Sequence, residues 1–484
     1  MCTIYDKLKE YSNSDYYGFH MPGHKRNQNM PGYTDAYLTD ISEIEGFDDL
    51  HHAQGILKDA QERAARIYRA QETHFLINGS TVGILSAIGG VTKKGDTVLV
   101  ARNCHKSVYH AIFMYELNPV YLYPTFDSYR QLNTEVSAED VRDALEKYPQ
   151  IRAVIIVSPT YDGVVSDVEA IALAVHEKGI PFIVDEAHGA HFGFYPYFPE
   201  NANTKGADIV IHSLHKTLPA LTQTALLHMN GNLVNRERVR EYLHMLQSSS
   251  PSYVLMASID SCMNLLENHR LELFQPYAAM LQKTREELRR LKYLSLTETE
   301  RFDKSKLIIS VKNAGMSGRR LYERLLYHYH LQMEMAAGTY ILAMTSVGDV
   351  QEGMDRLTAA LREIDAGLGT VTGGREIRAG VSCAGPGRPA KAFTVYPSSG
   401  ISKLIDEARE NGRIENRVKS LPFRDSVGHI ATEYAYLYPP GSPLLVPGER
   451  VSQEAADVLQ WYWEMGFTIE GLRHQQHIEV WIYG

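Results

Sequence analysis

The sequence predicts an α/β fold: a mostly parallel sheet with helices on both faces, followed by smaller α+β domains toward the C-terminus. Three observations support this prediction. Between about residues 72 and 300, short apolar runs alternate with amphipathic stretches, the pattern of buried parallel strands joined by helices. A Gly-rich stretch at 367–374 separates this region from the last part of the chain. The 484 residues are 44% hydrophobic, enough for more than one core.

Hydrophobic periodicity predicts the elements of the first two regions. Residues 1–55 are polar and interrupted by Gly and Pro, so we expect an N-terminal arm there. A large domain is expected over 56–290, and it opens with a helix over 56–70. Its predicted strands are 97–101, 119–123, 151–157, 181–185, 207–212 and 222–229. Its predicted helices fall near 81–89, 105–116, 137–147 and 167–178.

The rest of the chain is predicted to form two smaller domains. A long connecting helix is expected near 275–291, and a small α/β domain over 291–366. The Gly-rich stretch that follows is typical of a linker. A C-terminal domain is expected over 375–484, with a Pro/Gly-rich loop at 438–443.

Composition argues against several classes of protein. A net charge of −9 at pH 7 indicates no basic surface for nucleic acid. The four cysteines lie far apart, so neither a disulfide framework nor a zinc knuckle is indicated. The first residues show no signal peptide, and no apolar run reaches the length of about 18 residues that suggests a membrane span. We therefore expect a cytoplasmic protein without nucleic-acid or membrane partners.

Lys216 is the most informative residue, because it directly follows a predicted core strand. Lysine is rarely buried unless it is paired. A desolvated lysine amine with a lowered pKa condenses with an aldehyde to form a Schiff base. Ser213 and His215, just before it, carry groups that can donate hydrogen bonds to a phosphate.

Ser80 and Thr81 lie at a predicted junction between a loop and a helix, in Asn-Gly-Ser-Thr at 78–81. Backbone N–H groups and hydroxyls at a helix N-terminus bind phosphate. The alternative is an ordinary N-cap, in which Ser80 satisfies the first turn of the helix. Taken alone, this motif favours the N-cap.

Asp185 ends a predicted strand, in the motif Asp-Glu-Ala-His-Gly-Ala-His at 185–191. A buried carboxylate needs a cationic partner or several hydrogen bonds, and a pyridinium nitrogen would supply such a partner. A structural cap or salt bridge is one alternative. A metal site that uses His188 and His191 is another, but the nearby sequence offers no third nitrogen or sulfur ligand, so no metal is predicted.

His105 opens a predicted helix on the same side of the sheet as Ser80. Its flat imidazole can stack on a flat cofactor ring, although a lone histidine is more often a cap or a surface residue. The order of the four features makes them specific: a phosphate-type turn, a stacking histidine, a strand-end aspartate and a strand-end lysine. Together they describe a site for pyridoxal 5'-phosphate (PLP).

With these residues in place, the sequence resembles the prokaryotic ornithine/lysine/arginine decarboxylase family, which has a fold-type-I, PLP-dependent transferase-like fold. Two matching motifs are distinctive, His-Met-Pro-Gly-His-Lys at 20–25 and Tyr-Pro-Pro-Gly at 438–441. The matching stretches span most of the chain in family order, at 19–25, 48–52, 78–81, 103–107, 158–163, 185–191, 213–218 and 438–444.

The resemblance implies a role for each matching residue. Lys216 would bind the cofactor covalently, Asp185 would keep its pyridine nitrogen protonated, and His105 would stack on its ring. Either His105 or Lys216 would donate the proton to Cα of the product. The other implied cofactor-binding residues are Ala187 and His188 on the opposite ring face, and Ser80, Thr81, Ser213 and His215 at the phosphate.

The resemblance also implies the reaction, which is PLP-dependent decarboxylation of a basic amino acid in polyamine biosynthesis. Arginine to agmatine is the first expectation, lysine to cadaverine the second and ornithine to putrescine the third. Glu433 would face the distal cation of the substrate, and a solvated or structural carboxylate is the alternative for this residue.

Two other functions remain open. A PLP-dependent aminotransferase or β-eliminating lyase would keep the cofactor and change the reaction. A non-catalytic regulator would keep only the fold, although the intact Lys216, Asp185 and His105 argue against it. Acid-inducible family members carry a long N-terminal wing domain before the motif at 20–25, so we expect a short form without it. The expected assembly is a homodimer, or a dimer-based oligomer, with shared active sites.

Overall fold

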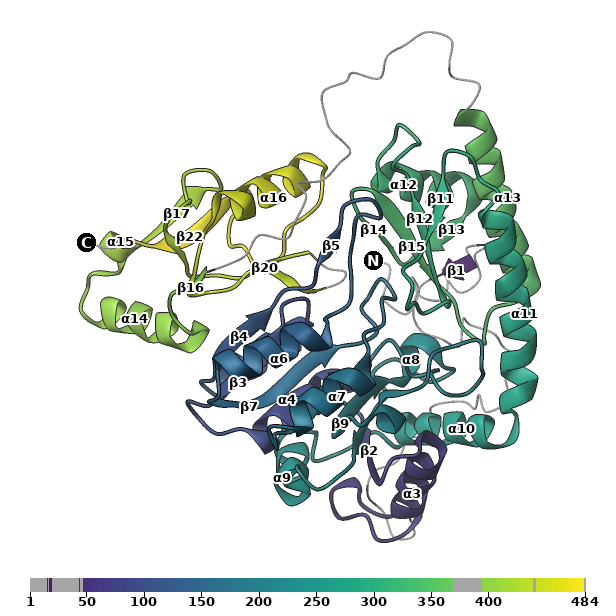
Figure 1. Cartoon of the computed structure of the whole chain (residues 1–484), viewed down its shortest axis with the longest axis horizontal. Helices are drawn as coiled ribbons and strands as arrows, with labels where there is room; N and C mark the ends of the chain where they lie inside the picture. The colour runs from purple at the N-terminus through teal and green to yellow at the C-terminus, as the bar shows by residue number, and fades with distance from the viewer. Residues whose placement is uncertain are drawn as a thin grey trace, which may run out of the picture.

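The computed structural model describes residues 15, 17–19, 43, 47–368, 393–437 and 441–482. Figure 1 shows three parts: a central sheet with its helices, a smaller sheet flanked by long helices, and a C-terminal unit formed by residues 393–437 and 441–482. The predicted fold class, α/β with a mainly parallel central sheet, is confirmed. The distinctive motif at 20–25 and residues 438–440 lie outside the described residues.

The central sheet has the strand order β2-β10-β9-β8-β7-β3-β4. Neighbouring strands from β9 to β4 run parallel, whereas β10 is antiparallel to β9 and β2. A sheet covered on both faces needs apolar residues at almost every position, and β8 and β9 are buried throughout. The strands are β2 (Glu72–Leu76), β3 (Thr97–Ala101), β4 (Asn118–Leu122), β7 (Ile151–Val157), β8 (Phe182–Asp185), β9 (Ile209–Ser213) and β10 (Ala225–Met229).

The helices of this part pack in separate groups. In Figure 1, α6 and α7 lie side by side toward the viewer, and α4 packs against α5 and α9. The six predicted strands and the predicted helices are all present, within about four residues at their ends. The helices are α3 (Ile56–Tyr68), α4 (Gly79–Val91), α5 (Lys106–Met114), α6 (Ala138–Lys147), α7 (Val168–His176), α8 (Leu214–Thr217), α9 (Arg236–Leu246) and α10 (Tyr253–Asn268). Two 3-10 turns are η1 (Leu50–His52) and η2 (Ala202–Lys205), and a hairpin pairs β5 (Phe126–Asp127) with β6 (Leu132–Asn133).

Strand β2 was not predicted, because polar residues interrupt its apolar pattern. Thr73 and His74 stand where a buried strand would carry apolar side chains. The structure gives each a polar partner: Thr73 Oγ1 bonds His228 Nδ1 at 2.7 Å, and His74 Nε2 bonds Glu72 Oε1 at 2.7 Å. Buried polar groups are tolerated where such partners exist.

The second part is an antiparallel four-stranded sheet in the order β11-β12-β15-β14. The predicted connecting helix leads into it along one side of the molecule (Figure 1). The last helix runs to Leu368, two residues into the predicted linker, and 369–374 lie outside the described residues. The elements are α11 (Arg270–Leu288), β11 (Ser295–Thr297), β12 (Lys306–Ser310), α12 (Gly318–Tyr329), β14 (Met335–Ala336), β15 (Tyr340–Met344) and α13 (Gln351–Leu368), and β1 (Tyr17–Phe19) pairs in parallel with β13 (Leu331–Met333).

The C-terminal unit is a five-stranded sheet with its own apolar core. Arg102, which follows β3, holds it against the central sheet through a buried ion pair of 3.1 Å between its Nη2 and Glu449 Oε2. Arg102 Nη1 also donates to the Pro443 carbonyl at 2.6 Å. The elements are β16 (Phe393–Thr394), α14 (Ser398–Glu410), α15 (Ile414–Arg417), β17 (Val418–Pro422), β18 (Ile430–Ala431), β19 (Ala435–Tyr436), β20 (Pro443–Leu445), β21 (Glu449–Arg450), α16 (Gln453–Glu464) and β22 (His477–Trp481). Among the described residues, no helix is both long and apolar enough to cross a membrane.

Candidate active site

A cleft of about 800 Å³ lies where the three parts meet, at the carboxyl ends of the parallel strands. Loops that leave neighbouring parallel strands emerge at the same edge, so side chains far apart in sequence converge there. All the predicted cofactor-binding residues line this cleft: Ser80, Thr81, His105, Asp185, Ala187, His188, Ser213, His215 and Lys216.

Lys216 lies on α8, a single helical turn that starts where β9 ends. The turn closes through the Leu218 N–H, which donates to the Leu214 carbonyl at 2.9 Å. Lys216 Nζ lies 2.9 Å from His188 Nε2. Burial lowers the pKa of the Lys216 amine, although the charge of Asp185 opposes this shift. A larger share of the amine is therefore uncharged near neutral pH than for an exposed lysine.

Asp185 is the last residue of β8 and is buried. Its Oδ1 accepts the Ala187 N–H at 3.1 Å. Burial raises the pKa of the Asp185 carboxyl, while Lys216 and the Ala187 N–H oppose the shift. A buried carboxyl at the wall of a cleft suits a cationic ligand atom, because such an atom would compensate for its lost hydration.

The N-terminus of α4 opens into the cleft without a side-chain cap. Asn78 occupies the N-cap position, but its side chain caps no N–H of α4. Instead, Asn78 Oδ1 accepts the Ser248 N–H at 3.2 Å. The N-cap alternative for Ser80 is therefore wrong, because Ser80 lies inside the helix. Uncapped N–H groups beside the hydroxyls of Ser80 and Thr81 can bind an anion.

Ser213 supplies a second observation that favours an anionic ligand. Its Oγ is buried and makes no hydrogen bond within the described part of the chain. Buried hydroxyls nearly always have a partner, so an acceptor at this wall of the cleft is expected. His215, on the next turn, is oriented by a 3.0 Å contact between its Nδ1 and the Thr224 carbonyl.

His105 is both a helix cap and a wall of the cleft. Its Nδ1 accepts the Ser107 N–H at 3.3 Å and lies 2.9 Å from Ser107 Oγ, which fixes the ring at the start of α5. Burial, together with the charge of Lys216, lowers the pKa of His105 to about 3. The ring is therefore neutral at pH 7, as stacking on a cationic aromatic ring requires.

The two histidines of the 185–191 motif have separate partners. His188 binds Lys216, and its Nδ1 lies 3.3 Å from Lys306 Nζ. His191 Nε2 lies 3.0 Å from Asp303 Oδ1. Within the described ranges, no group of three or more His, Cys, Asp or Glu side chains is arranged to hold a metal ion. The metal alternative for this motif therefore has no support in the geometry.

Glu433 is not among the residues that line the cleft. It is 8% exposed, and its two oxygens accept backbone N–H groups, from Arg473 at 3.0 Å and from Glu479 at 2.8 Å. These contacts match the alternative of a structural carboxylate. The structure does not bring Glu433 together with the other predicted site residues.

The second sheet contributes cleft residues that the sequence did not reveal. Glu334, between β13 and β14, accepts a hydrogen bond from the Tyr161 hydroxyl. The Tyr340 hydroxyl donates to Asp162 Oδ1 at 2.6 Å. Tyr161 and Asp162 belong to the stretch 158–163 that matches the family, so the sequence could have identified them as candidate site residues. Glu334 and Tyr340 belong to no recognisable motif.

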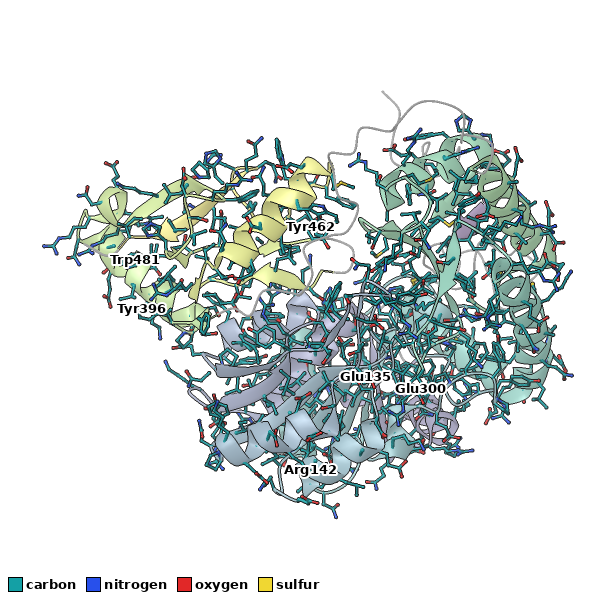
Figure 2. All side chains as sticks on the ribbon, turned by 45° about the horizontal axis from the view of Figure 1, so that its top comes forward. Glu135, Arg142, Glu300, Tyr396, Tyr462 and Trp481 are labelled. Atoms are coloured by element: carbon teal, nitrogen blue, oxygen red, sulfur yellow. The ribbon has the colours of Figure 1, made fainter. Side chains whose placement is uncertain are left out.

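The C-terminal unit also reaches the cleft. Figure 2 labels Tyr462 on α16, whereas Tyr396 and Trp481 lie farther out on the same unit. Tyr462 and Glu470 line the cleft, opposite residues of α12 such as Glu323. The outer part of the cleft therefore lies between the second sheet and the C-terminal unit, and it carries several carboxylates.

Comparison with known proteins gives matches over most of the chain. A family model described as "Orn/Lys/Arg decarboxylase, major domain" matches residues 2–346. A second model, for the C-terminal domain of the same family, matches residues 393–472.

Individual relatives cover nearly the whole chain. The Bacillus subtilis protein YaaO, named as uncharacterized, is 35% identical over 97% of this chain and 95% of its own length. An arginine decarboxylase of Halalkalibacterium halodurans is 32% identical over 94% of this chain and 91% of its own length. The solved structure of the Francisella novicida lysine decarboxylase LdcF gives a TM-score of 0.76 at 18% identity, covering 99% of this chain and 80% of that one. At 18% identity, this structural likeness is evidence for the fold alone.

Proposed function

The chain belongs to the Orn/Lys/Arg decarboxylase family and is a decarboxylase; on this premise we propose that it uses PLP to remove the α-carboxyl group of arginine, giving agmatine and CO₂. Lysine is the second candidate substrate and ornithine the third. One observation carries the proposal: the predicted cofactor-binding residues, which leave several different strands, line a single cleft around Lys216. The arginine decarboxylase among the relatives supports the order of substrates.

The residues of the cleft fit PLP. When bound, PLP supplies an aldehyde carbon that bonds an amine and a ring that accepts the electron pair left when CO₂ departs. The Lys216 amine would bind the aldehyde, and buried Asp185 would hold the protonated ring nitrogen. The uncapped start of α4 and the unpartnered Ser213 hydroxyl would hold the phosphate.

The chain's own residues also hold the substrate and move its protons. The carboxylates Asp162, Glu334 and Glu470 line the cleft and give it a negative charge that suits the distal cation of arginine or lysine. A guanidinium group is planar and binds a carboxylate through two parallel hydrogen bonds, which a compact ammonium does not do. Lys216 and His105 both line the cleft as candidate proton donors to Cα, and Lys216 is the better of the two, because the His105 ring is neutral at pH 7.

A substrate panel tests the proposal. The full chain, loaded with PLP, is incubated separately with arginine, lysine and ornithine, and released CO₂ and amine are measured. We expect agmatine from arginine at the highest kcat/KM. Lys216→Ala, loaded in the same way, is the control for turnover that does not depend on the lysine.

Other outcomes would contradict the proposal in different ways. Release of the substrate's keto acid without CO₂ or ammonia, in an amount equal to the bound PLP, would indicate an aminotransferase, because the amino group stays on the cofactor until a keto-acid acceptor is added. Release of ammonia from the α-amino group together with a keto acid would indicate an eliminating lyase. Absence of any product, despite PLP binding, would indicate a regulator. Cadaverine formed faster than agmatine would keep the reaction and reverse the order of substrates.

A further inference from the structure

His188 contacts two lysine side chains, Lys216, which lines the cleft, and Lys306, which is buried and does not line it. Its Nε2 lies 2.9 Å from Lys216 Nζ, and its Nδ1 lies 3.3 Å from Lys306 Nζ. Lys306 comes from β12 of the second sheet and is fully buried, and His188 is 5% exposed. We name Lys216, His188 and Lys306 the cleft network. Both ring nitrogens of His188 are thus in contact with amines that two different sheets supply.

The chemistry of these groups restricts their protonation. An ammonium group only donates hydrogen bonds, and a neutral imidazole has one donor nitrogen and one acceptor nitrogen. His188 therefore accepts from one lysine and donates to the other, whose amine is then uncharged. A doubly protonated ring does not fit, because burial and the charges of Lys216 and Lys306 lower the pKa of His188 well below its ordinary value.

The neighbouring carboxyls indicate which lysine keeps its charge. Burial works to raise the pKa of Asp303, but His191 and Lys306 are among the groups that lower it overall, so Asp303 stays ionised beside Lys306. Beside Lys216, burial raises the pKa of Asp185, and burial lowers the pKa of Lys216 against the opposing charges of Asp185 and Glu334. Lys306 is therefore the lysine to which we assign the charge. Among the described residues, the titratable groups that act on the two lysines include His105, Asp162, Asp185, His188, Asp303 and Glu334.

Gly163 makes room for Lys306 beside this loop. Its φ is 95°, in the region that favours glycine, and a Cβ at this position would lie 2.7 Å from Lys306 Cγ. Its carbonyl accepts the Asp303 N–H at 2.8 Å, which ties the start of β12 to the same loop. The glycine of the 158–163 stretch thus leaves the space that the Lys306 side chain occupies.

We infer that Lys306 is a positioning residue: by donating to His188 Nδ1 it keeps the ring proton on Nε2, so that His188 donates to an uncharged Lys216 amine. The inference rests on the proposed role of Lys216. An amine must be unprotonated to attack an aldehyde, and the cleft network keeps Lys216 unprotonated, with its electron pair engaged only by the His188 hydrogen bond, before the cofactor arrives.

Competitive acetylation of the full chain, with cofactor removed by dialysis against a competing amine, tests this inference. Acetic anhydride reacts with uncharged amines, so the pH dependence of Lys216 labelling, read by peptide mass spectrometry, reports the pKa of Lys216. In Lys306→Met we expect about tenfold less labelling at neutral pH, which corresponds to a pKa raised by about one unit. Lys304→Met is the matched control, because Lys304 Nζ lies over the Tyr197 ring and should leave Lys216 labelling unchanged.

A double-mutant cycle shows whether Lys306 changes the pKa of Lys216 through its hydrogen bond to His188 or directly through its charge. In a His188→Phe background, Lys306→Met should change Lys216 labelling little. An undiminished tenfold effect in that background would overturn the positioning role, because the Lys306 charge alone would then explain it. Unchanged labelling in the Lys306→Met single variant would overturn it as well.

A second measurement needs no substitution at Lys306, in case that variant does not fold. NMR of isotope-labelled histidine in the wild-type chain, with the His188 signal assigned by its loss in His188→Phe, reads the tautomer directly. A proton on Nε2 supports the inference, and a proton on Nδ1 overturns it. Neither labelling nor NMR depends on turnover, so their failure is distinguishable from failure of the proposed decarboxylation, which amine release measures.

Discussion

Two histidine networks begin two residues apart on the loop after β8, yet they end in different surroundings. His188 is the centre of the cleft network. Glu186 begins a second network that runs through the interior, and we name its members the core network: Glu186, His212, His228 and Thr73. The histidines of both networks are buried. Burial of a histidine therefore does not by itself identify a functional site.

The core network crosses from the loop after β8 through β9 and β10 to β2. Glu186 Oε2 lies 2.7 Å from His212 Nε2, and His212 Nδ1 lies 2.9 Å from His228 Nε2. His228 Nδ1 then meets Thr73 Oγ1 at 2.7 Å. Each ring nitrogen thus has a partner, and Glu186 also accepts the Ala202 N–H at 3.0 Å. A fully paired buried network of this kind stabilises one arrangement of the strands.

The cleft network differs in its ends, because it terminates in two amines and one of them lines an open cleft. Hydrogen bonds there determine which amine carries a proton, whereas those of the core network hold strands together. This contrast predicts that substitutions in the cleft network change the reaction more than the stability, and that substitutions in the core network do the reverse.

The largest expected effect is that of Lys216→Ala on turnover. Loss of the group that binds the cofactor covalently should lower kcat for arginine by roughly 10⁴-fold or more, the scale seen when a covalent catalyst is removed. The free energy of unfolding, measured by denaturant titration, should fall less than in His212→Phe, because only His188 Nε2 loses a partner, at the wall of an open cleft. A strongly destabilised variant would break the contrast between the two networks.

The next largest effect is that of His212→Phe on stability. The phenyl ring removes one buried hydrogen-bond partner from Glu186 and one from His228, which costs about 1–3 kcal/mol per group. Stacking on Tyr68, whose ring lies 4.7 Å away, is retained. Denaturant unfolding should show the loss, and kcat of the remaining folded enzyme should stay close to that of the wild type. A large loss of kcat in the folded fraction would contradict the structural role.

Acid should weaken the core network, and this gives a third test. Burial lowers the pKa of His212 to about 3, and it lowers that of His228 well below its ordinary value. Below pH 6.5, the ordinary pKa, the unfolded chain binds protons at both histidines and the folded chain does not, so falling pH favours unfolding.

The measurement is the slope of unfolding free energy against pH. Because His212→Phe removes one of these groups, its slope between about pH 6 and pH 4 should be shallower by about 1.4 kcal/mol per pH unit. Equal slopes for the variant and the wild type would show that other groups cause the acid sensitivity.

The smallest expected effect is that of Glu433→Gln, a carboxylate outside both networks. Its two oxygens accept the N–H groups of Arg473 and Glu479, and glutamine replaces one oxygen with a donor. We expect a loss of about 1 kcal/mol in stability and an unchanged KM for arginine. A clearly raised KM would instead support the predicted contact between Glu433 and the substrate.

The positions of candidate site residues could be predicted from the sequence where each lies at the end of a strand or in the loop that follows it. Asp185 ends β8 and Lys216 follows β9, and their apolar strands were readable from periodicity. Neighbouring parallel strands then bring such residues to one edge of the sheet without further information. The same reasoning failed for β2, where pairing of Thr73 with His228 replaces the apolar pattern.

Contacts between distant parts of the chain could not be predicted. From the second sheet, Glu334 reaches the cleft and Lys306 reaches His188, and their place depends on how that sheet packs against the first. The pairing of His212 with His228 depends on the register of β9 against β10, in which His212 faces Leu226. A shift of one residue would separate the two rings, and a single sequence does not reveal register.

The ion pair between Arg102 and Glu449 has a mechanical consequence. These side chains are 7% and 1% exposed, so a substitution that removes either one would leave the other charge buried and unpaired, at a cost of about 3–5 kcal/mol. The pair therefore links the position of the C-terminal unit to that of the central sheet. On the opposite wall, α12 contributes long side chains to the cleft, such as Glu323 and the exposed Tyr327, and exposed side chains reorient within nanoseconds. The cleft thus combines a wall held by a buried ion pair with a wall that carries long, exposed side chains.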